Sequence, residues 1–319
     1  MTIQPPKVAL VALFALPVQA ASPGTALSQA RPAILEIDVE NLVEYVQNTY
    51  LPTALRIGDI TAVNGHPVKG SYVGVPFKLG LTPAPQPGQA VADITRISFR
   101  EESFQILGLD GAPVGSILTL GTAGGSPPPG APSAQENGDL AIVGGTGAFL
   151  GVRGEKGRGI SIASLRKAGA HEDPANRRQI GGGHIREILY VIPMSQPEIL
   201  TSAGGPPVTH SKDSTPVSVT KPATPGEILS LYATGLGPTS PSSDPEKPFP
   251  PSPVMPVNSP LQVTVNGRTA EVVNAVGSPG TADRYQVNFR VPPGAASGTA
   301  TIQVTAAWIA SPPATFAVK

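Results

Sequence analysis

The first residues in this chain whose types and spacing could support chemistry are three closely spaced carboxylates. Glu36, Asp38 and Glu40 alternate with apolar residues between positions 35 and 39, which is the two-residue period of a β-strand. If this acidic face points into a closed barrel, burial raises the pKa of the carboxyl groups and suits them to proton transfer. If it points outward, it is an ordinary solvated face, which is the interpretation we favour for an alternating strand.

An arginine late in the N-terminal half is the fourth candidate catalytic residue. Arg186 alternates in phase with His184 and Tyr190, so a strand would place the three side chains on one face. Its guanidinium group could orient an anionic or phenolic ligand. The alternative is a surface position, which is the commoner one for an isolated arginine.

Composition excludes or disfavours several classes of chemistry. The chain has 0 Cys, which excludes thiol catalysis, zinc–thiolate sites and iron–sulfur clusters. Its 4 His show no HExxH spacing and no GxSxG serine motif is present, so we expect no metal site and no cofactor. The 22 Lys plus Arg balance the 22 Asp plus Glu, so no net positive charge attracts nucleic acid.

The elements that must position these residues are β-strands. The 38 Pro and 36 Gly among 319 residues disfavour helices, whereas 40% apolar residues are enough for a packed core. At about 150 residues per domain the length predicts two domains. We therefore expect an all-β chain.

The N-terminal segment predicts export. Lys7 precedes an apolar run from Val8 to Val18, and Ala20 follows at a position where signal peptidase reads small residues. The run is shorter than the ~20 residues that a membrane-spanning helix needs. We expect residues 1–20 to be a signal peptide and the mature protein to be secreted, either extracellular or at the cell surface.

Segments between Pro- and Gly-rich turns predict eight or nine strands in an N-terminal domain at residues 31–195. After a first strand at residues 34–46, they are residues 57–63, 71–79, 90–99, 103–107, 114–120, 139–143, 159–164 and 184–192. Residues 121–137 have few apolar side chains and are expected to form a loop. A series of short strands like this one predicts a sheet that closes on itself or folds into a sandwich.

A polar segment at residues 196–215 is expected to link this domain to a second one at residues 216–319. Asn266-Gly267 between two alternating segments predicts a β-hairpin with a type I′ turn. With further strands at 216–220, 227–233, 285–291, 301–305 and 314–318, the pattern is that of an immunoglobulin-like sandwich. The nine prolines of residues 238–260 predict a stiff extended loop.

The glycine-rich segment Leu140–Gly151 (LAIVGGTGAFLG) has some likeness to a dinucleotide-binding turn. Its spacing is GxGxxxG instead of GxGxxG, and the glycines that follow would destabilise the helix that a phosphate site needs. We interpret these glycines as backbone devices that let a strand bend and let Phe149 enter the core.

The segment Asp139–Glu155 (DLAIVGGTGAFLGVRGE) also resembles the GGTGxFxxxRG segment of the dirigent and allene oxide cyclase barrel superfamily. An acidic first strand (ILEIDVE) and the segment RIGDITAVNGHPVKGSYVG extend the resemblance to about residues 33–193. The resemblance implies a closed eight-stranded antiparallel barrel with a mainly apolar cavity, which binds a small hydrophobic molecule and in some members steers a cyclisation or radical coupling. It also implies a homo-oligomer, although the chain lacks the cysteines of plant dirigent proteins.

Aromatic residues of the predicted barrel strands are the candidates for contact with such a ligand, and core packing is the alternative role for each. These candidates are Tyr72, Phe77, Phe99, Phe104 and Tyr190.

The segment Thr224–Pro238 (TPGEILSLYATGLGP) is similar to an immunoglobulin-like C-terminal domain of secreted proteins of soil bacteria. This similarity implies an accessory role, such as attachment to cell-surface or extracellular components. Two functions stay open: a secreted barrel that binds a small hydrophobic molecule and guides its cyclisation or isomerisation, and a non-catalytic extracellular scaffold or adhesion protein. A cavity in the barrel would favour the first function, and a barrel filled by side chains would favour the second.

Overall fold

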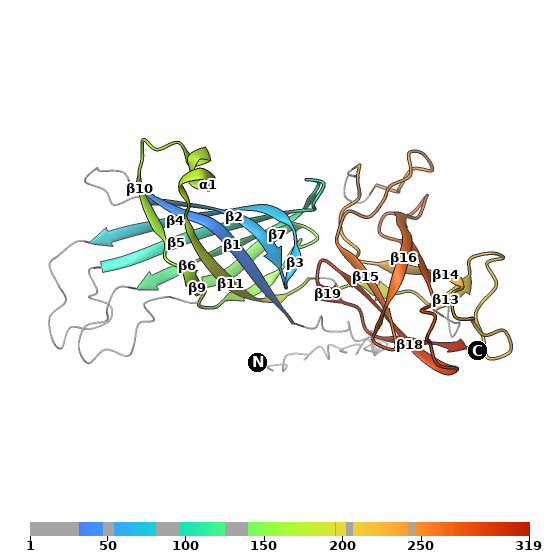
Figure 1. The fold of residues 1–319 in the computed structure, drawn as a ribbon. Helices are drawn as coiled ribbons and strands as arrows, with labels where there is room; N and C mark the ends of the chain where they lie inside the picture. The colour runs from blue at the N-terminus through green and yellow to red at the C-terminus, as the bar shows by residue number, and fades with distance from the viewer. Residues whose placement is uncertain are drawn as a thin grey trace, which may run out of the picture.

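The computed structural model describes residues 32–46, 54–80, 96–124, 140–194, 196–201, 207–241, 243 and 247–319. These residues form two β-rich bodies that lie end to end in Figure 1. The N-terminal body is a closed antiparallel barrel and the C-terminal body is a second curled sheet. The expected signal peptide, residues 1–20, and most of the expected loop at residues 121–137 lie outside the described residues.

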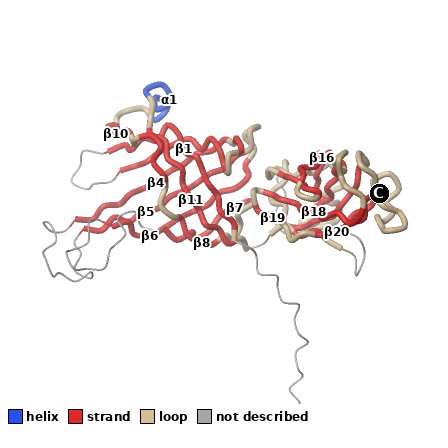
Figure 2. Tube along the Cα trace, turned by 60° about the horizontal axis from the view of Figure 1, so that its bottom comes forward, coloured by secondary structure: helices blue, strands red, loops and turns tan. Residues whose placement is uncertain are grey.

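Eight of the described strands close the barrel, because β1 pairs with both β2 and β11. Around the wall they are β1 (Ala33–Val46), β11 (Gly183–Ile192), β8 (Arg153–Lys156), β7 (Leu140–Gly147), β6 (Pro113–Gly124), β5 (Arg96–Leu107), β4 (Lys69–Gly80) and β2 (Ala54–Val63). Shorter elements beside the wall are β3 (His66–Pro67), β9 (Ile160–Ala163), β10 (Arg166–Gly169), a 3₁₀ turn (Pro174–Asn176) and α1 (Arg177–Ile180). Figure 2 shows how the strands dominate this body. The predicted all-β class and the eight-stranded antiparallel barrel are confirmed.

The wall differs from the predicted strands in two places. Residues 96–107 form the single strand β5, where two strands were predicted, because the charged residues Arg100 and Glu102 continue the ladder with β4 and β6 instead of breaking it. The short strand β8 was not predicted, since its sequence RGEK lies among glycines. It pairs with both β7 and β11 and so completes the wall.

Strand β1 changes its inward face at a bulge. Leu35, Ile37 and Val39 are fully buried in the barrel core. The register then shifts between Val39 and Leu42, and Asn41 takes a φ of 50°. After this shift Leu42 lies in the core, so the side chain two residues further along, Glu44, also points into the barrel.

The glycine-rich segment forms a tight turn between β7 and β8, and no helix follows it. Phe149, in this turn, is 1% exposed and packs in the barrel core. A Cβ atom at Gly145 would lie 2.5 Å from the carbonyl oxygens of both Phe149 and Ser116. The interpretation as backbone devices is therefore supported at Gly145 and at Gly147, which has a φ of 61°, whereas a Cβ atom at Gly144 would meet only Nη1 of Arg153, at 3.5 Å.

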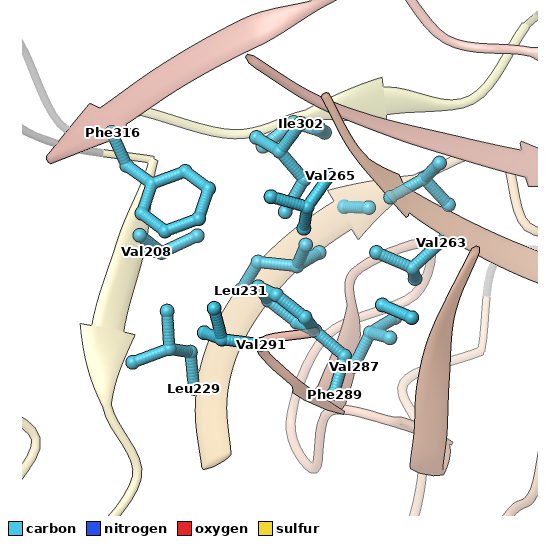
Figure 3. Packing of buried hydrophobic residues seen from close by; sticks show 14 of the residues in the cluster. Val208, Leu229, Leu231, Val263, Val265, Val287, Phe289, Val291, Ile302 and Phe316 are labelled. Carbon is cyan, nitrogen blue, oxygen red and sulfur yellow. The ribbon is translucent and has the colours of Figure 1, made fainter. Parts of the chain in front are cut away.

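The C-terminal body is a nine-stranded sheet in the described residues, curled around one apolar core. Its strands are β12 (Glu198–Ile199), β13 (Val208–His210), β14 (Ile228–Thr234), β15 (Leu261–Val265), β16 (Arg268–Gly277), β17 (Tyr285–Arg290), β18 (Gly298–Ala306), β19 (Ile309–Ala310) and β20 (Ala314–Val318). Figure 3 shows Leu231, Val287 and Phe289 packed in this core. The predicted Asn266-Gly267 hairpin is confirmed, with φ values of 49° and 75°.

Two segments of this body depart from the sequence interpretation. Strands β12 and β13 fall within residues 196–215, which we assigned to a linker, and both pair with β14. Residues 216–220 form no strand, and their sheet contact is an isolated bridge from Pro216 to Thr209. The described part of the loop 238–260 has no strand, as predicted, and it inserts Phe249 and Met255 into the core.

Candidate ligand-binding site

The barrel interior has an apolar part and a charged part. The apolar part is filled by side chains, namely Leu35, Ile37, Val39, Leu42, Ile60, Val63, Val68, Tyr72, Phe104, Ile106, Val114, Ile117, Ile142, Phe149, Val152, Leu189 and Val191. The charged part is formed by inward-facing residues of β1, β2, β5, β8 and β11, namely Glu44, Arg56, Arg100, Glu102, Lys156 and Glu187. Charged groups in a barrel interior are costly to desolvate, so their concentration in one part marks it as the candidate site.

Lys156 is the centre of this charged cluster. Its Nζ lies 3.1 Å from Oε2 of Glu102 and 3.0 Å from Oε2 of Glu187. The three side chains are 6%, 2% and 4% exposed, so two carboxylates share one ammonium group almost out of contact with water. An arrangement of this kind adds little net stability compared with apolar packing, because desolvation offsets the attraction between the charges.

Two hydroxyl groups hold the Glu102 carboxylate in place. The Tyr72 hydroxyl donates a hydrogen bond of 2.9 Å to Oε1, and the Thr119 hydroxyl donates a longer one of 3.4 Å to Oε2. Burial, together with the negative charge of Glu102, raises the pKa of Tyr72 well above 10.0. Tyr72 therefore keeps its proton and acts as a donor to Glu102.

A second ion pair lies beside the cluster. Arg56 donates from Nε to Oε2 of Glu44 at 2.8 Å, and the Glu44 side chain is 4% exposed. Burial opposes the charge on Arg56, but the hydrogen bond to Glu44 and the attraction to its negative charge together outweigh this effect and raise the pKa of the guanidinium group. Arg56 stays cationic and carries its own counter-ion.

A cavity of about 250 Å³ opens onto these charges. Its lining residues come from β2, β5, β8, β9, β11 and the turn after β8, and they are Arg56, Arg100, Lys156, Gly157, Arg158, Gly159, Ser161, Ile185 and Glu187. A Cβ atom at Gly159 would collide with Oε2 of Glu187, so glycine at this position leaves room for the carboxylate. The lining therefore combines four cationic side chains with one carboxylate and an isoleucine.

Two of the four cations have no carboxylate at salt-bridge distance among the described residues, although Arg100 is near enough to Glu187 for its charge to lower the pKa of that carboxyl group. Among the described residues, neither Arg100 nor Arg158 forms a salt bridge, whereas Arg56 and Lys156 do. The Nε of Arg100 is buried without a hydrogen-bond partner in the described part of the chain. Buried donors normally have an acceptor, so this guanidinium group suits an acceptor supplied from the cavity.

Glu187 is the carboxyl group of the lining, and its surroundings shift its pKa. Burial raises the pKa of Glu187 above 4.5, and the negative charge of Glu102 adds to the rise, whereas the positive charges of Lys156 and Arg100 oppose it. A carboxyl group with a raised pKa beside a cavity is suited to exchange a proton with a bound molecule.

The three carboxylates singled out in the sequence do not line this cavity. Glu36, Asp38 and Glu40 occupy the face of β1 opposite the buried Leu35, Ile37 and Val39, which is the outer face of the barrel. Glu36 and Glu40 are exposed, as in the solvated arrangement that we favoured, whereas Asp38 is only 8% exposed.

Arg186 lies on the same outer face and pairs with one of these carboxylates. Its Nε and Nη2 donate to Asp38 at 2.9 and 3.1 Å, and His184 lies 3.2 Å from the same carboxylate. Burial of Asp38 is outweighed by these hydrogen bonds, which lower its pKa below 3.8. The structure brings Arg186, His184 and the largely buried Asp38 together on the outer face of the barrel wall, away from the cavity.

The predicted aromatic residues divide between the two faces. Tyr72 and Phe104 are 1% and 0% exposed and pack together in the interior, with ring centroids 5.2 Å apart. Phe99 and Tyr190 are 42% and 45% exposed and face outward, which corrects the interior position expected for Phe99. The side chain of Phe77 lies outside the described residues.

Sequence reasoning missed the charged cluster, although its residues carry a recognisable signal. Arg100 and Glu102 alternate in phase with the buried Phe104, and Glu187 alternates in phase with the buried Leu189. A charged residue at an inward position of an alternating strand must find a partner inside. Lys156, in the unpredicted strand β8, carried no such pattern.

Within the described residues, no three His, Asp or Glu side chains are grouped closely enough to hold a metal ion. No described helix is long and apolar enough to cross a membrane.

Comparison with known proteins does not assign the chain to a family or the site to a function. No protein-family model and no curated protein matches the chain. A solved structure that aligns with it is the crystal structure of the N-terminal domain of the Streptococcus gordonii adhesin Sgo0707, with 8% identity and 92% of this chain and 93% of that chain covered. The TM-score of 0.18 is too low to support any argument about fold or function.

Proposed function

We propose that the barrel binds a small organic molecule that has an apolar body and an anionic group. The observation that carries this proposal is the cavity of about 250 Å³ whose lining contains two guanidinium groups, Arg100 and Arg158, that form no salt bridge with the described residues. Guanidinium groups bind carboxylates and phosphates in a planar, bidentate manner. Ile185 and the packed interior beside it supply the apolar surface.

Catalysis is the second part of the proposal. A molecule held in one conformation by its anionic group is favourably placed for isomerisation or cyclisation. Glu187 would donate or accept the proton that such a step requires, and Lys156 would stabilise the carboxylate form. The alternative function, a non-catalytic scaffold or adhesion protein, was tied to a solidly packed barrel, and the cavity with its convergent polar groups favours ligand binding.

The finer structural and cellular assignments are also proposals. The GGTGAF segment supports membership of the dirigent and allene oxide cyclase barrel superfamily, and the seven strands expected at residues 216–319 support an immunoglobulin-like sandwich. The charged cavity differs from the mainly apolar one that the superfamily resemblance implies. The apolar run at residues 8–18 supports export, which sequencing of the mature N-terminus would test.

The ligand class is tested with benzoate, benzyl alcohol and benzylammonium, which share a ring and differ in charge. By calorimetric titration we expect benzoate to bind more tightly than the other two, because the guanidinium groups of Arg100 and Arg158 favour a carboxylate. Each of the changes Arg100→Gln and Arg158→Gln should weaken benzoate binding by roughly 10-fold or more, the loss of one charge-assisted hydrogen bond.

The matched control is Arg186→Gln, which removes an arginine from the outer face and should leave benzoate binding unchanged. Preference for benzylammonium, or equal weakening by all three arginine changes, would contradict the proposed site. Failure of benzoate to bind at millimolar concentration would do the same.

A further inference from the structure

Three β-hairpins of the described residues share the same two-residue turn but not the same turn sequence. In each turn both residues have positive φ, as in type I′ geometry. The φ values are 49° and 75° for Asn64-Gly65, 49° and 75° for Asn266-Gly267, and 46° and 64° for Ala307-Trp308.

The first two turns carry the residues that this geometry favours. Asn and Gly tolerate left-handed φ, and the Asn side chains add hydrogen bonds. Oδ1 of Asn64 accepts from the Glu36 N–H at 2.7 Å, and Oδ1 of Asn266 accepts from the Thr301 N–H at 2.8 Å. Both turns are therefore stabilised by their own sequence.

The Ala307-Trp308 turn, between β18 and β19, has neither advantage. Left-handed φ is unfavourable for residues with a Cβ atom, and neither side chain can make the hydrogen bond that Asn makes. Two adjacent residues of this kind persist only where the surrounding structure holds them. Something other than the hairpin itself must favour Ala and Trp here.

The surrounding structure is the apolar part of the barrel. Ala307 is 1% exposed and belongs to the barrel core cluster, and Trp308 packs against the same cluster. Neither residue belongs to the core of the C-terminal body that carries them. Beside this contact, Asn258 donates from Nδ2 to the carbonyl oxygen of Pro113 at 2.7 Å.

We propose that the Ala307-Trp308 turn is an intramolecular plug whose partner is the apolar end of the chain's own barrel. Ala307 and Trp308 improve the packing of the barrel core and destabilise the hairpin that carries them. The plug completes the barrel core and couples the two bodies, and it leaves the charged cavity as the accessible part of the interior. This proposal does not depend on the ligand proposed above.

The test is the double change Ala307→Asn with Trp308→Gly in the full chain, which installs the favoured Asn-Gly turn. If the turn served only its hairpin, both bodies would be as stable as before or more so. We expect instead that the barrel amides near Val114 and Val152 exchange hydrogen at least about 10-fold faster, while β18 amides are unchanged or slower. The thermal midpoint of the barrel should fall by about 5 °C.

Two matched variants separate packing from turn strain. Trp308→Phe keeps a ring in the barrel and should retain most of the protection of the barrel amides. Asn266→Ala with Gly267→Trp places the unfavourable pair on an exposed turn and should accelerate exchange in β15 and β16 alone.

The chain contains 1 Trp, so its fluorescence reports on the plug directly. We expect the native emission to be blue-shifted and less quenched by acrylamide than that of the unfolded chain. Solvent-like native emission, or unchanged barrel exchange in the Asn-Gly variant, would overturn the proposal.

Discussion

The interiors of the two bodies differ although both are built from short alternating strands. The core of the C-terminal body consists of apolar residues, such as Leu231, Val287 and Phe289, and contains no buried Asp, Glu, Lys or Arg among the described residues. The barrel interior holds Glu102, Lys156 and Glu187 at 6% exposure or less.

The two interiors therefore differ in how much they contribute to stability. The apolar core gains its stability from burial alone, roughly 25 cal/mol per Å² of apolar surface. The charged cluster gives up part of that gain, since buried ion pairs rarely exceed apolar packing in stability. Buried charged residues beside a cavity mark the barrel as the candidate functional site, whereas the apolar core of the C-terminal body stabilises the fold.

The largest expected effect comes from removing the shared cation. Lys156→Ala leaves the Glu102 and Glu187 carboxylates buried without the ammonium group that they share, which should cost about 3–5 kcal/mol of barrel stability. Urea unfolding followed by segment-resolved hydrogen exchange should show this loss in the barrel strands and none in the C-terminal strands.

The matched control is Lys221→Ala, which removes a lysine that is half exposed and pairs with Asp213 at 2.7 Å. It should leave both bodies nearly unchanged. If both lysine changes lowered stability equally, the barrel interior would not differ from the C-terminal body in its dependence on a buried charge.

A smaller effect of opposite sign is expected when the whole cluster becomes apolar. The combined changes Lys156→Met, Glu102→Leu and Glu187→Leu should be neutral or raise barrel stability by about 1–4 kcal/mol, because no charge remains to be desolvated. Benzoate binding should weaken, since the cavity loses part of its charged lining. A large loss of stability in this variant would mean that the charges stabilise the barrel more than apolar packing would, which contradicts the comparison made above.

The smallest effect concerns pH. Because burial raises the pKa of Glu187 above 4.5, its contribution to stability is complete below pH 4.5 and is lost as the pH rises through its folded pKa. The pKa of Asp38 is lowered, so its contribution has the opposite sign: it is present above pH 3.8 and is lost as the pH falls through the folded pKa. We expect Glu187→Gln to flatten the decline of barrel stability above pH 4.5, measured by urea midpoints.

The exposed change Glu40→Gln serves as the control for this pH profile and should leave the decline in place. An unchanged slope in Glu187→Gln would show that Glu187 does not titrate in this range.

Much of the fold was predictable because it depends on local pattern. The alternation around Glu36 and Asp38 predicted a strand with an outer polar face, and Asn266-Gly267 predicted a hairpin. The site was not predictable in the same way. Arg100 and Glu102 interrupt an apolar pattern, so the sequence suggested a break at a position where the strand is continuous.

The sequence by itself determined the β-class, the turns and the alternation of faces, because these depend on neighbours along the chain. Only the tertiary structure decided which face became the interior and which distant charges met there. Lys156 and Glu102 belong to strands that do not pair with each other, and barrel closure alone brings them within 3.1 Å. The Ala307-Trp308 turn follows the same rule, since its residues fit the apolar end of the barrel and not the hairpin that carries them.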